Sequence, residues 1–164
     1  MQIDFQEVFY AAEDHYLQPE EIANFKNQVN SLKERLATYK WLRDQEISLF
    51  QPIANGLLRD FPNTKTELIE RALKHWIAVM RYGSMAMLLN NPDYFQHRLL
   101  EWLTDIIHAH EMVAIEQRLY ERLQDSLYEM LPQEQWQLLK PFLSQAHHTL
   151  LESNTNLQPI LVGE

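Results

Sequence analysis

Apolar residues along most of this chain recur every three to four positions, the spacing that places them on one face of an α-helix. The clearest case is the proline-free stretch 66–89, where Asn63 or Thr64 is positioned to cap the first turn and the Asn-Asn-Pro run at 90–92 ends the pattern. We therefore expect a long central helix here. Its periodic positions are Leu68, Ile69, Ala72, Trp76, Val79, Met80, Gly83 and Met87.

The same period predicts helices before the central one. Residues 3–12 show a short amphipathic pattern, and a second helix is expected to start at Pro19, because proline suits the first helical position. This second pattern continues to Pro52, which is expected to kink or break the helix, since proline lacks the backbone donor. One more short helix is then expected over residues 53–61.

Three further helices are expected after the central one, over residues 94–110, 113–130 and 133–151, with a kink at Pro141. Only three glycines are present, which argues against a sheet. Because short and long helices alternate, the pattern favours an all-α, single-domain, globin-like fold of seven to eight helices over an up-down bundle.

The expected domain covers residues 1–153, with 1–14 as an N-terminal helical extension and 133–152 as the C-terminal helix. Residues 154–164 are expected to form a flexible tail.

Charge and cysteine content narrow the function. The formal net charge of -9 argues against nucleic acid or an anionic membrane surface as a partner. Without cysteine, the chain has no disulfide, no thiol nucleophile and no thioether-linked prosthetic group. No signal peptide and no membrane-spanning apolar run is recognisable, so we expect no membrane insertion and a cytoplasmic location.

Candidate chemistry is sparse. No nucleophile, phosphate-binding or dinucleotide motif is present, so we expect no enzyme and no catalytic residue. The histidines lack the spacing of a zinc signature, and no metal site is expected. Haem needs one proximal histidine, for which His75 and His97 are the candidates. Lys74, His75 and Arg81 are expected to form a polar stripe on the central helix.

The stretch from Tyr16 to Pro62 resembles the phycobiliprotein family, the helical light-harvesting subunits of cyanobacterial phycobilisomes. The resemblance continues into the central helix, which is similar to the family's chromophore helix, and it implies the same globin-like fold. It also implies that the first residues match the N-terminal hairpin through which two subunits associate. The points of agreement are Leu17, Ile22, Val29, Arg35, Leu36, Leu42, Ala54, Leu57 and Pro62.

The central helix departs from the family at its pigment residues. Ala72 stands where the family has the bilin-attachment cysteine, which excludes a covalent bilin at that position. His75 replaces the aspartate that bridges the pyrrole nitrogens, and Lys74 replaces an arginine that pairs with a propionate. Only Arg81 is kept. The resemblance therefore implies either no pigment or a non-covalent bilin or haem held by Lys74, His75 and Arg81.

Four hypotheses follow from the resemblance. The first is a pigment-free protein that acts through protein–protein contacts in phycobilisome assembly, turnover, attachment or regulation, peripheral to the thylakoid where it meets phycobilisomes. The second is a module that binds or senses a tetrapyrrole without a covalent bond. The third is a rod or core subunit pigmented only through a neighbour, and the last a pigment lyase or isomerase, for which no acid/base pair is recognisable.

Partner residues are expected on the N-terminal helix. Ile3, Phe5, Val8 and Phe9 form its apolar face, which needs a covering surface, and a homodimer is the simplest prediction. For the stripe of Lys74, His75 and Arg81, the alternative to a ligand site is pairing with acidic residues of other helices, with Trp76 and methionines filling the interior.

Overall fold

The computed structural model describes residues 5–110 and 112–152, with side chains from Val8 onward, and every regular element in these ranges is helical. The all-α prediction is thus confirmed for this part of the chain. Ile3 and the expected tail over 154–164 lie outside the described residues. The elements are α1 (Phe5–Asp14), α2 (Pro19–Asp60), α3 (Thr66–Leu89), α4 (Pro92–Phe95), α5 (Glu101–Ala109), α6 (Val113–Met130) and α7 (Gln133–His147), with π-helical segments η1 (Gln96–Leu100) and η2 (His148–Glu152).

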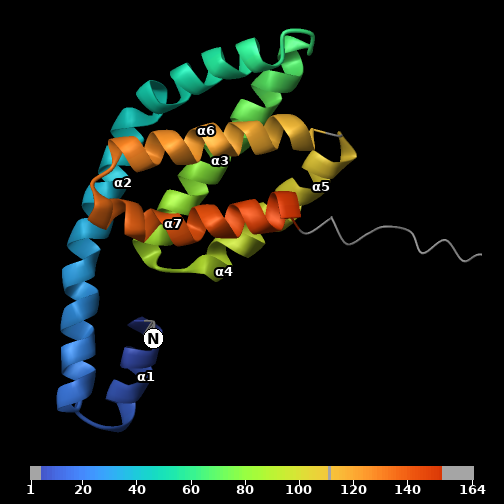
Figure 1. The fold of residues 1–164 in the computed structure, drawn as a ribbon. Coiled ribbons are helices and arrows are strands. Elements are labelled where there is room, and N and C mark those ends of the chain that lie inside the picture. Colours follow the sequence, from blue (N-terminus) through green and yellow to red (C-terminus); the bar gives the residue numbers. More distant parts are fainter. Residues whose placement is uncertain (1–4, 111, 153–164) are drawn as a thin grey trace, which may run out of the picture.

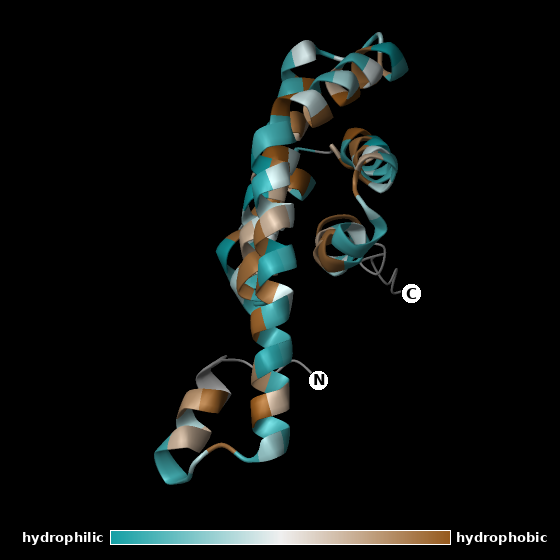
Figure 2. Ribbon diagram, turned by 90° about the vertical axis from the view of Figure 1, so that its left-hand side faces the viewer, coloured by the Kyte–Doolittle hydropathy of each residue, from teal (hydrophilic) through white to brown (hydrophobic). Residues whose placement is uncertain are grey.

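The helices form a packed body and a projecting arm. In the body, α2 packs against α3, α6 and α7, and α3 packs against α6 and α7. α1 packs against α2, and Figures 1 and 2 show that α1 and the N-terminal part of α2 stand away from the other helices. We call this pair of segments, α1 and residues 19–34, the N-terminal hairpin. No side chain of residues 19–34 is buried.

Arg35 marks the point where α2 enters the body. Its side chain is the first on α2 to be buried, and its Nη1 donates to the backbone oxygen of Leu88 at 2.6 Å. Leu88 lies in the last turn of α3, where the negative end of the helix dipole favours a cation. Arg35 therefore ties the base of the hairpin to the end of the central helix.

Of the kink or break expected at Pro52, α2 shows no break, and the separate short helix expected over residues 53–61 is wrong. α2 runs without interruption from Pro19 to Asp60, so residues 53–60 are its last turns rather than a separate helix. Figure 1 shows the expected change of direction instead, since the blue and teal parts of α2 run at an angle to each other. Buried Phe50 and Ile53 on either side of Pro52 hold the helix against the body, and this packing offsets the lost hydrogen bond.

The structure confirms the predicted C-terminus of the central helix but not its predicted N-cap. Asn90 caps its C-terminus in the left-handed conformation with φ 53, and Asn91 then accepts a hydrogen bond from the backbone of Tyr94 at 2.9 Å to start α4. This confirms the predicted stop. At the start, however, the N-cap is Lys65, which makes no side-chain cap, so the expectation of Asn63 or Thr64 is wrong.

The periodic face of α3 forms the centre of the core. Trp76 and Ala72 have no exposed surface, and Ile69, Val79 and Met87 are each exposed by 2% or less. α6 covers this face with Leu119 and Leu123, and α7 covers it with apolar side chains of its own. The predicted apolar face of the central helix is therefore confirmed. The α7 residues in the core are Trp136, Leu139, Phe142, Leu143 and Ala146.

Candidate functional site

An exposed apolar stripe runs along α2 from the N-terminal hairpin to Leu36, just beyond Arg35. Five α2 residues, spaced alternately three and four positions apart, make one continuous line along the helix. Each is 38–47% exposed, and Figure 2 shows hydrophobic segments on both helices of the hairpin. A spacing of three and four is that of a coiled-coil seam, which another helix normally covers. The apolar stripe consists of Ile22, Phe25, Val29, Leu32 and Leu36.

α1 adds two aromatic side chains to this surface. Phe9 is 70% exposed and Tyr10 is 68% exposed, whereas Val8 is half-buried. Of the interface residues predicted from the sequence, Phe9 thus lies open to solvent and Val8 is partly covered. Ile3 and the side chain of Phe5 lie outside the described part. The periodic pattern along α2 predicts a helix but does not say what covers its apolar face.

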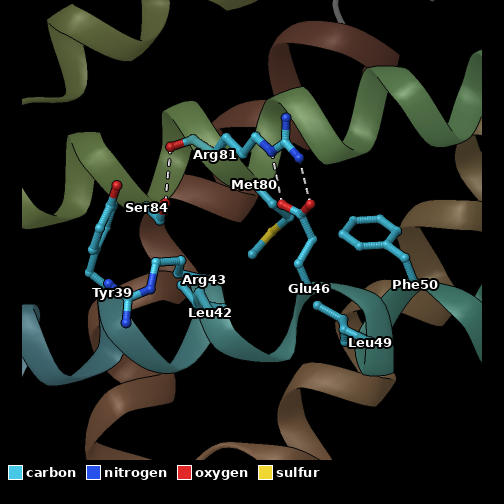
Figure 3. Close-up of a pocket in the computed structure, with 9 residues that line it drawn as sticks. All are labelled: Tyr39, Leu42, Arg43, Glu46, Leu49, Phe50, Met80, Arg81 and Ser84. Atoms are coloured by element: carbon cyan, nitrogen blue, oxygen red, sulfur yellow. Dashed lines mark hydrogen bonds and ion pairs between the residues drawn. The ribbon is translucent and has the colours of Figure 1, made fainter.

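A groove of about 440 Å³ lies between α2 and α3, on the body side of the apolar stripe. Figure 3 shows Tyr39 and Arg43 at one end of it and Phe50 at the other, with Glu46 between them. The remaining wall is mainly apolar. Farther along the same two helices lies a second, shallower depression lined by Ile47, which is 80% exposed. The first groove is lined by Tyr39, Leu42, Arg43, Glu46, Leu49, Phe50, Met80, Arg81 and Ser84.

Arg81 is held across this groove by α2. Its Nε donates to Glu46 Oε2 at 2.8 Å and its Nη2 to Glu46 Oε1 at 2.6 Å, a two-pronged ion pair (Figure 3). The hydrogen bond from Arg81 holds the pKa of Glu46 below its ordinary value, and Glu46 raises the pKa of Arg81. The side chain of Arg81 is still 66% exposed, so it can meet a further partner.

His75 lies on the other side of α3, in contact with α6. Its Nδ1 lies 2.6 Å from Oε1 of Glu116, and the indole nitrogen of Trp76 donates to Oε2 of the same carboxylate, also at 2.6 Å. Glu116 has no exposed surface. Burial raises the pKa of Glu116, while its hydrogen bond to His75 acts in the opposite direction. The sequence analysis missed Glu116, although its place on the apolar face of α6, between Ile115 and Leu119, was a usable signal.

The expected single stripe of Lys74, His75 and Arg81 is wrong. His75 pairs with α6, Arg81 pairs with α2, and Lys74 is exposed. His75 and Arg81 are six positions apart, which places them about 120° apart around the helix. The groove between α2 and α3 is lined by Arg81 but not by the other two.

The two pairings agree with the alternative interpretation of these residues. His75 and Arg81 each meet an acidic side chain of another helix, and Trp76 fills the interior beside them. Ala72 is fully buried as well, so its Cβ faces packed side chains rather than an open cleft. This side of α3 is therefore closed by the protein's own residues.

The described residues show no metal cluster and no membrane-spanning helix. Within residues 5–110 and 112–152, no group of three or more histidine, cysteine or acidic side chains is arranged to hold a metal ion. The helices of the same ranges include none that is both long and apolar enough to cross a bilayer. Comparisons with models of known protein families and with curated proteins found no match to this chain.

Proposed function

We propose that this chain is a phycobiliprotein-like protein of globin-like fold that carries no covalent bilin and acts through protein–protein contacts. The setting we propose is the phycobilisome, in its assembly, turnover, attachment or associated regulation. The resemblance of residues 16–62 to the family supports this setting. The exposed apolar stripe on the N-terminal hairpin is the observation that carries the proposal.

The hairpin supports a contact function because its apolar surface is unusual for a lone subunit. Four of the five stripe residues precede Arg35, where α2 enters the body, and the packing of α1 against α2 leaves each of the five at least 38% exposed. Side chains such as Val29, which is 47% exposed, leave apolar surface in contact with water. Packing against a partner helix would bury this surface and stabilise the complex. A projecting apolar helix pair therefore fits a subunit that binds another protein.

The simplest partner is a second copy of the chain. The heptad spacing of the stripe continues from Leu36 to Tyr39, which lines the groove between α2 and α3. A two-fold arrangement would place the hairpin of each copy along the groove of the other, and the same contact would form twice. Arg81 and Arg43 at the groove would then meet the acidic hairpin, which includes Glu13, Asp14, Glu20 and Glu21.

The experiment compares binding to purified phycobilisomes by the tagged protein and by two variants. The wild-type chain should retain phycobiliproteins on the affinity resin. The double variant Val29→Asp/Leu36→Asp should lose them, because the aspartates must give up water at the interface. Trp102→Asp is the matched control, since Trp102 is 62% exposed but lies on α5, away from the hairpin. Failure of the wild-type chain to bind would contradict the phycobilisome setting.

Non-covalent binding of a bilin or haem is the second candidate function. The observation that favours it is the groove itself, which combines the cationic side chains of Arg43 and Arg81 with an apolar wall. Tetrapyrrole propionates need such cations, and the ring needs apolar surface. Because His75 is engaged by Glu116, the groove is the better place for such a ligand.

An absorption spectrum tests this alternative. The protein should be purified from a host that makes both haem and bilin. A Soret or red band that disappears in Arg81→Ala, but persists in His75→Ala, would support a ligand in the groove. A colourless protein, with the pigment supply verified, would reject it.

A further inference from the structure

The carboxyl group of Glu116 is fully buried between His75 and Trp76. Trp76 donates an uncharged N–H to it, and His75 is the one ionisable group within hydrogen-bonding distance among the described residues. The imidazole uses Nδ1 for this contact and is 11% exposed.

The other charged groups that pack against α6 do not pair with Glu116. From α2, Asp60 pairs with Arg118 at 2.8 Å and with Arg122 at 2.7 Å. From α7 and η2, His147 and Glu152 pair with each other at 3.2 Å. On α3, Arg71 and Lys74 make no hydrogen bond or ion pair with Glu116. Tyr120, one turn along α6, stacks on His147 at 4.2 Å between ring centroids.

We propose that His75 and Glu116 form a proton-dependent latch between α3 and α6. With a proton on Oε1, Glu116 is neutral: it donates to Nδ1 of His75 and still accepts the Trp76 N–H on Oε2. When that proton leaves, Glu116 becomes a fully buried negative charge in contact with the imidazole and the indole N–H. Such a charge is costly in an apolar interior. The contact between α3 and α6 is therefore tighter at mildly acidic pH than at alkaline pH.

The direction of the stability change follows from proton uptake. Burial raises the pKa of Glu116 above its unfolded value, so the folded chain holds a proton that the unfolded chain has lost. Folding then takes up a proton, and stability falls as pH rises above the ordinary glutamate pKa of about 4.3. The stabilisation by the protonated pair is fully present below that value and is lost as pH passes the pKa of Glu116 in the folded protein.

Urea unfolding of the full chain across mildly acidic to alkaline pH tests the latch with Glu116→Gln. Glutamine keeps an oxygen to accept the Trp76 N–H but carries no charge. We expect the unfolding equilibrium constant of the wild-type chain to rise with pH, by at most about tenfold per pH unit for one proton. Glu116→Gln should lack this component. Glu121→Gln, on the exposed side of the same helix, is the control and should retain it. Equal pH dependence in wild type and Glu116→Gln would overturn the proposal.

A second measurement needs no variant to fold. In ¹H–¹⁵N spectra of the wild-type chain, the indole N–H resonance of Trp76 should shift with pH, because this group donates to the carboxyl that gains or loses the proton. A Trp76 indole resonance that stays constant over the pH range in which stability changes would overturn the latch.

Discussion

The residue that most restricts the chemistry of this protein is Ala72. It occupies the position at which the phycobiliprotein resemblance places a bilin-bearing cysteine, and it has no exposed surface. The neighbouring Trp76 is equally buried and is anchored by Glu116. A reactive thiol at position 72 would thus be covered by core side chains.

Single-cysteine variants test whether position 72 is closed. The natural chain has no cysteine, so each variant carries one thiol. Ala72→Cys should react slowly with an aromatic disulfide reagent when folded and quickly in urea, because only unfolding exposes the sulfur. Glu70→Cys, on the exposed side of the same helix, should react quickly in both states. Rapid labelling of folded Ala72→Cys would show an open cleft on this side of α3.

Among the elements, α2 and α3 are the pair that shapes the groove. Their contact is fixed at one point by the ion pair of Glu46 with Arg81, in which two hydrogen bonds define the relative position of the helices. Arg81 is mostly exposed, so water screens much of this interaction. The pair therefore contributes more to the shape of the groove than to the stability of the fold.

Glu46→Gln tests this assignment through pH. Because Arg81 lowers the pKa of Glu46, the stabilisation from the pair is present above the unfolded glutamate pKa and is lost as pH falls through the lower folded value. At neutral pH we expect the variant to lose less than about 1 kcal/mol of unfolding free energy, the range of exposed ion pairs. Urea titrations should show this difference vanish in acid. Glu129→Gln, at an exposed position of α6, should be neutral throughout.

The sequence predicts the helices of the body well because their signals are local. The periodic face of α3 and its stop at Asn90 are properties of consecutive residues, and both are found. The separate helix expected after Pro52 is not found, because proline removes one hydrogen bond whereas the packing of Phe50 and Ile53 acts over the whole contact with the body. That packing cannot be read from the neighbours of Pro52 in the sequence.

The site residues were harder to predict because their partners are distant in the sequence. His75 and Glu116 are 41 positions apart, and Arg81 and Glu46 are 35 apart. Helical periodicity places each residue on a face but does not say which helix that face meets. The same limit applies to Val29, since an apolar face looks alike whether it lies in the core or on a projecting arm.

At the scale of the whole molecule, the chain divides its apolar surface between a closed core and an open hairpin. The core packs around α3, where His75 pairs with Glu116 of α6 and Arg81 pairs with Glu46 of α2. The hairpin exposes apolar side chains on both of its helices, and it leads directly into the groove between α2 and α3. This arrangement predicts a protein whose association state, rather than a bound pigment, determines what it does.

Static light scattering of the purified chain is the most direct test of that account. We predict a mass of twice the 19.6 kDa of one chain for the wild type and for the control Trp102→Asp. The variants Val29→Asp/Leu36→Asp and Phe5→Asp/Phe9→Asp should have the mass of one chain, with unchanged helical content by circular dichroism. The account would be contradicted if the wild-type chain stayed monomeric at concentrations well above those at which subunits ordinarily associate. It would also be contradicted if both double variants remained dimeric.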